Sequence, residues 1–255
     1  MPQPLIPVGE LVTSGWNEYI RDWKANLELS IRYLLAAVIM FVAVLVAERI
    51  PLAGGSLLVI VASIAGAAIS LHTSILLTDV ILKRDKGTAN AKHDDAVGYK
   101  LFWSMFWISI LVGLATLGGF ILFVLPGIWL AVKFSVAQLS LIEDGKKGTE
   151  ALSASSELVK GRWWGVFGRS LVIGFLVGTL AMIMAWAIMA VIGLFIGFDK
   201  IVAISDVGMS NSYMTRPSPL MEGIQNMMSG VIQVVLMPLG IIYSAKIFHS
   251  LKKTK

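Results

Sequence analysis

Cysteine is absent from this chain of 255 residues, and charge is scarce. Without cysteine the chain can form no disulfide, no thiolate metal site and no cysteine nucleophile. Charged residues make up 15% of the chain and hydrophobic residues 56%, whereas soluble domains carry about 25% charged residues. This shortage argues against a water-soluble fold, and so against a soluble enzyme. The net charge of +5 is compatible with nucleic-acid binding, but in a membrane protein basic residues mark cytoplasmic loops.

Long runs without charge occur along the chain. A membrane-spanning helix needs about 20 mostly apolar residues, and such runs must be helical because the hydrocarbon layer holds no water for unpaired backbone groups. The uncharged run at 101–132 is too long for one span, and Leu125-Pro126-Gly127 within it predicts a hairpin turn. The sequence therefore predicts an all-α integral membrane protein, a single domain over 1–255, with six transmembrane helices at about 31–49, 56–79, 101–124, 127–142, 171–194 and 223–246.

The basic residues lie mainly on one side of these six spans. Seventeen of the 21 Lys and Arg residues fall in the two terminal segments and the two connections that share a side. Three fall on the other side, Arg49, Lys200 and Arg216. Because cytoplasmic segments collect Lys and Arg, we expect both termini in the cytoplasm. The N-terminal segment has no short apolar core followed by a cleavage site, so we expect no signal peptide.

The segment before the first span predicts an amphipathic helix at about 9–28. Apolar residues recur at helical spacing on one face, namely Val12, Trp16, Tyr19, Ile20, Trp23 and Leu27. This pattern is typical of a helix that lies in the inner headgroup layer with its aromatic residues toward the lipid. Trp16 and Trp23 are therefore candidate headgroup contacts. The alternative is a helix that packs this face against another protein segment.

A second interfacial helix is predicted at about 149–161, on the same side of the membrane. Thr149 is placed to cap its first turn. Basic and aromatic residues at its end are suited to anionic headgroups and to the membrane interface. These further candidates for headgroup contact are Lys160, Arg162, Trp163 and Trp164.

The order of elements recurs three times. Each time an aromatic-bearing entry is followed by two spans and a charged exit, and Trp16, Trp103 and Trp163 mark the three entries. Two spans return the chain to the side where it began, so this order predicts three parallel helical hairpins. A six-span protein with tryptophan at its interfaces would show a similar order without any repeat.

The most specific stretch of the chain is 125–172. It contains Leu125-Pro126-Gly127, Glu143-Asp144-Gly145 and Trp163-Trp164, and the chain opens with Val8-Gly9-Glu10-Leu11. In these motifs the chain resembles the membrane-domain family found beside some bacterial glycerophosphodiester phosphodiesterases, which also contains stand-alone six-span proteins of uncharacterised function. The resemblance implies a six-span protein of a prokaryotic cytoplasmic (inner) membrane. It implies no phosphodiesterase activity, because the chain has no room for that barrel domain.

Ionisable side chains inside the predicted spans are candidates for function, because a charge in the hydrocarbon layer is costly. Lys133 in the fourth span could bind a substrate or an anionic lipid, or could form a structural ion pair or reach the outer surface. His72 and Asp79 are two helical turns apart on one face of the second span. They could form a proton or ion path, or make packing contacts, with Asp79 paired to Lys83 one turn away.

Catalytic signatures are missing from the sequence. It holds no Walker motif, no His-Glu-x-x-His and no Gly-x-Ser-x-Gly, so we expect no catalytic residue, cofactor or metal. The leading hypothesis is a non-enzymatic integral membrane protein that organises lipids or partner proteins in the cytoplasmic membrane, with no nucleic-acid partner. The alternative is a transporter or channel for a small anion or lipid-like solute. Its polar interior would contain Lys133, His72 and Asp79, and Gln225 and Gln233 of the sixth span could line it.

Overall fold

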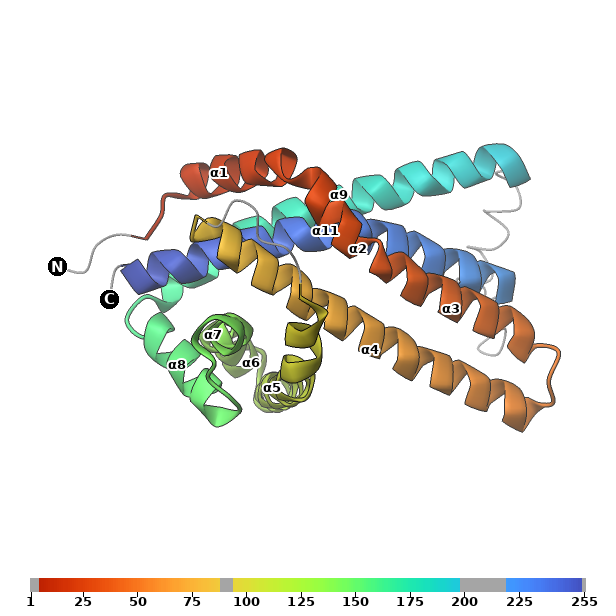
Figure 1. Ribbon diagram of the computed structural model, residues 1–255, viewed down its shortest axis with the longest axis horizontal. Coiled ribbons are helices and arrows are strands. Elements are labelled where there is room, and N and C mark those ends of the chain that lie inside the picture. The colour runs from red at the N-terminus through yellow and green to blue at the C-terminus, as the bar shows by residue number, and fades with distance from the viewer. Residues whose placement is uncertain (1–4, 88–93, 198–218, 254–255) are drawn as a thin grey trace. The chain divides into compact units, whose positions relative to one another are not determined.

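Regular structure in the described part of the chain is entirely α-helical. The computed structural model describes residues 5–87, 94–197 and 219–253. Lys200 and Arg216, which the topology prediction uses, lie outside these ranges. The helices of the described ranges, shown in Figure 1, are α1 Val8–Arg21, α2 Trp23–Ser30, α3 Arg32–Ala47, α4 Leu52–Asp85, α5 Asp95–Leu122, α6 Val124–Lys133, α7 Ala137–Asp144, α8 Thr149–Val159, α9 Trp163–Ile196 and α11 Pro219–Lys253.

Six helical segments are long and apolar enough to cross a membrane, as predicted. They are Trp23–Ala47, Gly54–Asp85, Asp95–Leu122, Val124–Asp144, Trp163–Phe195 and Pro219–Lys253. The chain is therefore an all-α membrane protein with six candidate spanning helices. The helices extend beyond the predicted spans at 56–79, 171–194 and 223–246. A helix keeps its backbone hydrogen bonds in the headgroup layer and in water as well, whereas the sequence criterion counts only its apolar part.

The turn between the third and fourth spans lies earlier than predicted. Phe123 is extended (φ −166°, ψ 157°) and separates α5 from α6, while Pro126 and Gly127 lie inside α6. Proline fits there because the N–H groups of a helix's first turn have no partner within the helix. A Cβ on Gly119 of α5 would lie 2.8 Å from the Gly127 Cα. Glycine therefore lets these two helices approach closely, but it does not form the turn.

The fourth span is interrupted, whereas a single helix at 127–142 was expected. α6 ends at Lys133, and α7 begins at Ala137. Ser135 Oγ donates to the Val132 carbonyl oxygen at 2.8 Å, which satisfies a backbone group at the break. α6 and α7 together still make one of the six apolar segments.

The two helices predicted to be interfacial have other bounds in the structure, and their place at the membrane interface stays a prediction. The one expected at 9–28 is divided by Asp22 into α1 and α2, and α2 belongs to the first candidate span, Trp23–Ala47, which therefore begins earlier than the predicted 31. The one expected at 149–161 is α8, but Thr149 is not its N-cap, because Gly148 holds that position with φ of 52°. Glycine tolerates this positive φ because it has no Cβ.

The helices group into two compact units. The first unit contains Met1–Leu29, Leu71–Val177 and Met237–Lys255, and the second contains Ser30–Ser70 and Gly178–Leu236. α4, α9 and α11 each contribute one part to each unit, whereas α5 to α8 lie wholly in the first. The middle predicted hairpin thus belongs to one unit and the outer two are shared between units. That the three hairpins are true repeats stays a prediction.

The first unit has the larger buried core. Side chains from α4, α5, α7 and α8 meet there in one cluster of Ile75, Met105, Ile108, Ala137, Leu141 and Ala151. In α4 the residues from Ile75 to Leu82 are all buried, so this part of α4 is surrounded by other helices. This cluster therefore packs α4, α5, α7 and α8 against one another.

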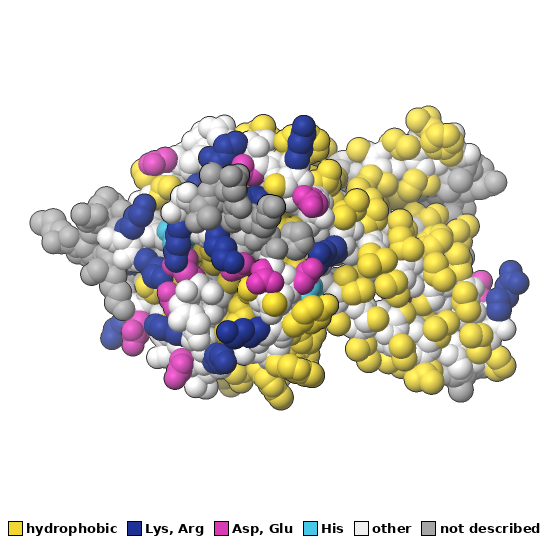
Figure 2. Space-filling view, viewed as in Figure 1, with side chains coloured by type: hydrophobic (Ala, Val, Ile, Leu, Met, Phe, Trp, Pro, Cys, Tyr) yellow, Lys and Arg dark blue, Asp and Glu magenta, His cyan; other side chains and the backbone are white. Residues whose placement is uncertain are grey.

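The second unit is built on α3, with parts of α4, α9 and α11. Small residues let its helices approach closely, since a Cβ on Gly230 of α11 would lie 2.5 Å from the Ala37 Cβ of α3. The visible face of this unit in Figure 2 is mostly hydrophobic, while Lys, Arg, Asp and Glu side chains gather over the first unit. A hydrophobic exterior suits helices that are surrounded by lipid.

Candidate functional site

α1 lies against α11 by one of its faces, on which Leu11, Gly15 and Glu18 are buried. A Cβ at Gly15 would clash with the ring of Tyr243 in α11. The Tyr243 hydroxyl also donates a hydrogen bond to the carbonyl oxygen of Val12 at 3.3 Å. Because an aromatic ring lies directly on the helix backbone here, the contact fixes how α1 is rotated about its own axis.

A second face of α1 and α2 is apolar and exposed. Trp16, Ile20, Trp23 and Leu27 are each exposed by between 39% and 51%. Asn17, which is also exposed, lies about 100° around the helix from Trp16. The helix thus has one face on the protein, one apolar face and one polar face. We call the four exposed apolar residues the apolar stripe.

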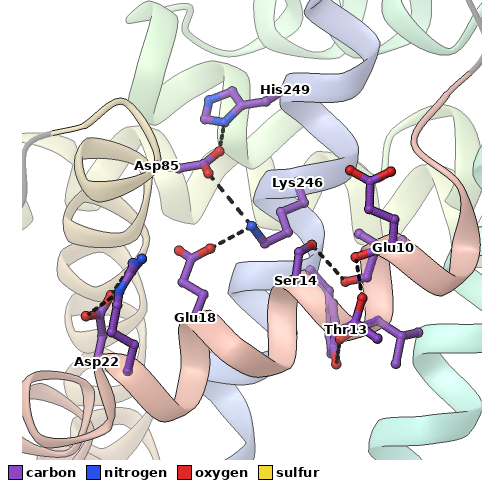
Figure 3. Close-up of polar contacts among 12 residues, drawn as sticks. Glu10, Thr13, Ser14, Glu18, Asp22, Asp85, Lys246 and His249 are labelled. Carbon is purple, nitrogen blue, oxygen red and sulfur yellow. Dashed lines mark hydrogen bonds and ion pairs between the residues drawn. The ribbon is translucent and has the colours of Figure 1, made fainter.

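The buried face of α1 contributes Glu18 to a network of ion pairs, part of which Figure 3 shows. Lys246 of α11 pairs with Glu18 of α1 at 2.7 Å and with Asp85, the last residue of α4, at 4.0 Å. Only 15% of the Lys246 side chain and 9% of the Glu18 side chain are exposed. A buried charge is costly unless an opposite charge compensates it. The pair therefore defines where α1 sits on α11.

His249, nearly one turn further along α11, lies between two carboxylates. Its Nδ1 contacts Asp85 Oδ2, and its Nε2 lies 2.6 Å from Glu143 Oε2. A neutral imidazole has one N–H donor and one acceptor nitrogen, whereas the imidazolium has two donors. Only the protonated ring can donate to both carboxylates, so this geometry fits a charged His249.

Glu143, close to the end of α7, has three cationic neighbours. Its side chain is only 5% exposed, and its Oε1 lies 2.7 Å from Lys252 Nζ and 3.3 Å from Lys86 Nζ. Lys252 also pairs with Asp144 at 2.6 Å. With His249 protonated, four carboxylates face four cations. The ion-pair network consists of Glu18, Asp85, Lys86, Glu143, Asp144, Lys246, His249 and Lys252, and it joins α1, α4, α7 and α11.

The segment before α1 is tied to α9 and α11. Arg169 of α9 donates from Nε to the Ile6 carbonyl oxygen at 2.8 Å and from Nη2 to the Leu5 carbonyl oxygen at 3.1 Å. The Ile6 backbone N–H donates to Ser250 Oγ of α11 at 2.9 Å. α1 is therefore held at its beginning by these hydrogen bonds and near its end by Glu18.

Lys133, the predicted intramembrane cation, is the last residue of α6. Its Nζ lies 4.5 Å from the centroid of the Trp129 ring and 5.6 Å from that of the Phe134 ring, which are cation–π contacts. Its carbonyl oxygen accepts a hydrogen bond from Ser155 Oγ of α8 at 2.8 Å. Its ammonium group therefore lies beside two aromatic rings, and no ion pair of the described residues involves it.

His72 and Asp79, the other two predicted intramembrane residues, have separate neighbours. Asp79 pairs with Lys83 at 2.5 Å, as predicted. The His72 ring packs on the ring of Tyr99, with centroids 4.7 Å apart. Its Nε2 is buried without a hydrogen-bond partner in the described part of the chain. No hydrogen bond or ion pair of the described residues joins Lys133, His72 and Asp79 to one another.

Four of the six predicted headgroup residues are exposed. Trp16 and Trp23 belong to the apolar stripe, Trp164 is 77% exposed, and Lys160 at the end of α8 is exposed as well. These side chains are accessible to a surrounding lipid layer.

The other two, Arg162 and Trp163, make contacts within the protein. Arg162 donates to the Leu251 carbonyl oxygen at 3.4 Å, in the last turn of α11, where a cation favours the negative end of the helix dipole. Trp163 donates from Nε1 to the Trp129 carbonyl oxygen at 3.2 Å and stacks on Phe167 with centroids 5.1 Å apart. Both residues therefore position α8 and α9.

The ion-pair network was not predicted from the sequence, in which its lysines indicate only the topology. A signal was present, because Lys246, His249 and Lys252 are three residues apart and so follow one side of a helix. Acidic residues at the ends of other helices, such as Asp85 and Glu143, are their natural partners. Within the described ranges there is no group of three or more His, Cys, Asp or Glu side chains placed to hold a metal ion.

Comparison with known proteins adds no relative: no family model, no curated protein and no solved structure matches this chain. The resemblance to the membrane-domain family therefore stays a prediction. The proposed function therefore rests on the contacts and exposed surfaces of the chain itself.

Proposed function

We propose that this chain is a non-enzymatic integral membrane protein of a prokaryotic cytoplasmic (inner) membrane that organises lipids at the inner surface. In this proposal both termini are cytoplasmic, α1 lies in the inner headgroup layer, and α2 begins the first spanning segment, Trp23–Ala47, at the same level. The apolar stripe then faces the acyl chains, and the polar face of the helix faces water. The observation that carries the proposal is an exposed apolar stripe on a helix that is locked to the protein by another face.

A basic side chain beside the stripe, that of Lys24, favours anionic lipids. Lys24 is exposed, and its Nζ lies 5.8 Å from the centroid of the Trp23 ring. A lysine near an anionic membrane surface contributes about 1 kcal/mol to binding. The tryptophan and the lysine would together recognise the boundary between acyl chains and anionic headgroups.

The transporter alternative has less support from the geometry. It requires polar groups that converge on a path through the membrane, whereas Lys133, His72 and Asp79 have different neighbours. A partner protein that covers the apolar stripe is the stronger competitor, because it would use the same exposed surface.

Native mass spectrometry of the full chain, released from nanodiscs of phosphatidylethanolamine and phosphatidylglycerol, tests the proposal. We expect the wild type to retain phosphatidylglycerol preferentially. Lys24→Gln should weaken this preference about fivefold, the equivalent of about 1 kcal/mol. Trp16→Ser should lower the total number of retained lipids, because it removes apolar surface from the stripe.

Asn17→Ser is the matched control, since it changes the neighbouring residue on the polar face. It should leave both the number and the type of retained lipids unchanged. The proposal would be wrong if Trp16→Ser retained as many lipids as Asn17→Ser. It would also be wrong if the wild-type chain carried a partner protein in fixed stoichiometry in place of lipid, and Trp16→Ser lost that protein.

A further inference from the structure

An open groove of about 260 Å³ lies within the second unit, between α4 and α11. Its base is made by buried small residues of α3 and α11, including Ala36, Ala37 and Gly230. Gly230 could not carry a side chain without moving α3, because a Cβ there would lie 2.5 Å from the Ala37 Cβ. The groove exists because the residues at its base are too small to fill it.

The sides of the groove carry neutral polar groups. α11 contributes Asn226, Ser229 and Gln233, which follow one face at spacings of three and four residues, and α4 contributes Ser63 and Ser70. Ser229 and Gln233 are exposed, and no side-chain hydrogen bond within the described part of the chain involves Asn226, Ser229 or Gln233. The Ser63 hydroxyl donates to the Val59 carbonyl oxygen at 2.8 Å, so its oxygen remains an acceptor for another molecule.

The groove lies at the depth of the acyl chains. Ala37 at its base is ten residues from Ala47, the last residue of α3. At the helical rise of 1.5 Å per residue this is about 15 Å, half of a hydrocarbon layer of about 30 Å. Hydroxyl and amide groups at this depth have no water to bind and are costly without a hydrogen-bond partner. A molecule that reaches them would arrive from the lipid.

The lining restricts the chemistry of that molecule. None of the described lining residues is charged, and a charged ligand in the hydrocarbon layer would need an opposite charge beside it. Amides and hydroxyls offer both donors and acceptors, which suits hydroxyl and ester groups. The volume is just below the roughly 300–1,000 Å³ that is usual for a ligand site, so the groove accommodates a headgroup and not a whole lipid.

We propose that this groove binds the headgroup of an uncharged, hydroxyl-bearing lipid such as a monoacylglycerol. Asn226 and Gln233 donate to and accept from its hydroxyl and ester oxygens. Its acyl chain lies along the neighbouring surface of α4, where Ile60 and Ile64 are exposed by 54% and 65% and each precedes a lining residue by one helical turn. This site is separate from the apolar stripe, because α1 does not contribute to the groove.

Photolabelling of the full chain in nanodiscs tests this site. The probe is a monoacylglycerol with a diazirine in its acyl chain, and the labelled peptides are mapped by mass spectrometry. We expect labelling of α4 near Ile60 and Ile64, competition by unlabelled monoacylglycerol, and no competition by phosphatidylglycerol. Asn226→Leu combined with Gln233→Leu should reduce labelling at least fivefold, which corresponds to the loss of about one net hydrogen bond.

Gln225→Leu is the matched control, because Gln225 is on the same helix and does not line the groove. This variant should be photolabelled to the same extent as the wild type. The proposal would be overturned if the double variant were labelled as strongly as the wild type. It would also be overturned if phosphatidylglycerol competed as well as unlabelled monoacylglycerol.

A transmembrane helix of a second copy is the competing occupant. Ala67→Cys tests it, since the chain has no other cysteine and Ala67 lines the groove. A disulfide between two copies in the membrane would assign the groove to helix pairing and contradict the lipid site. Lipid retention by α1 would be unaffected by either result, so failure of this proposal is distinct from failure of the proposed function.

Discussion

In the first unit charged side chains at the ends of helices pair with opposite charges, whereas in the second unit neutral hydroxyl and amide side chains line an open groove. The charges of the ion-pair network are compensated by residues of the same chain, and they hold α1 in a fixed orientation. The polar groups on the α11 side of the groove have no such partners in the described part of the chain. The difference separates polar groups that stabilise the fold from polar groups that are available to a ligand.

The largest effect is expected for Glu143→Ala. Three cationic side chains, those of Lys86, His249 and Lys252, would lose a carboxylate that is only 5% exposed. Breaking a buried ion pair by removing one partner costs about 3–5 kcal/mol. We expect a lower midpoint of thermal unfolding in detergent and faster hydrogen exchange at the ends of α7 and α11.

Asp22→Asn serves as the control for this loss. Asp22 pairs with Arg21, whose side chain is 67% exposed, and an exposed pair contributes at most about 1 kcal/mol. If Glu143→Ala and Asp22→Asn had equal effects, the ion-pair network would not be what stabilises the first unit.

The next largest effect is expected for Gly15→Ala. The added Cβ would clash with the ring of Tyr243, which is fully buried, and such overpacking costs about 1–3 kcal/mol. Hydrogen exchange of α1 should become faster as the helix leaves α11. Gly9→Ala is the counterpart on the same helix, where nothing lies within 4 Å of a Cβ. It should leave hydrogen exchange of α1 unchanged or slow it, because alanine has a higher helix propensity than glycine. Faster exchange in both variants would show that the clash with Tyr243 is not the cause.

A smaller loss is expected in the second unit for Gly230→Ala. Its Cβ would lie 2.5 Å from the Ala37 Cβ, whereas ordinary van der Waals contacts begin at 3.4 Å. α3 and α11 must therefore separate by roughly 1 Å, which costs about 1–3 kcal/mol. Gly240→Ala, also in α11 but with nothing within 4 Å of its Cβ, should not be destabilised. Thermal unfolding of the two variants in one detergent compares them directly, and equal midpoints would contradict the close approach of α3 and α11.

The smallest effect on stability is expected for Gln233→Leu. Gln233 is exposed in the groove, and substitutions of such residues usually change stability by less than about 0.5 kcal/mol. Thermal unfolding in detergent without added lipid should therefore match that of the wild type, in contrast to Glu143→Ala. A loss as large as that of Glu143→Ala would mean that the polar groups of the second unit also stabilise the fold.

The sequence predicts the six spans because each depends on a local property, a run of about 20 apolar residues. It misplaces the turn after α5, because Pro126 and Gly127 are as well suited to the first turn of a helix as to a hairpin. The amphipathic pattern of residues 9–28 is visible, but not which face the protein covers, since that depends on Tyr243 and Lys246 far along the chain. The ion-pair network and the groove depend on contacts between helices, which a single sequence does not specify.

Accessibility of single spin labels in lipid nanodiscs tests the central claim most directly, because the chain has no native cysteine. Trp16→Cys and Asn17→Cys place a label on the apolar stripe and on the adjacent polar face of α1. We predict that the label at position 16 is more accessible to oxygen, which concentrates in the acyl layer, and that the label at position 17 is more accessible to a water-soluble nickel complex. Equal, high accessibility of both labels to the nickel complex would contradict the placement of α1 in the headgroup layer.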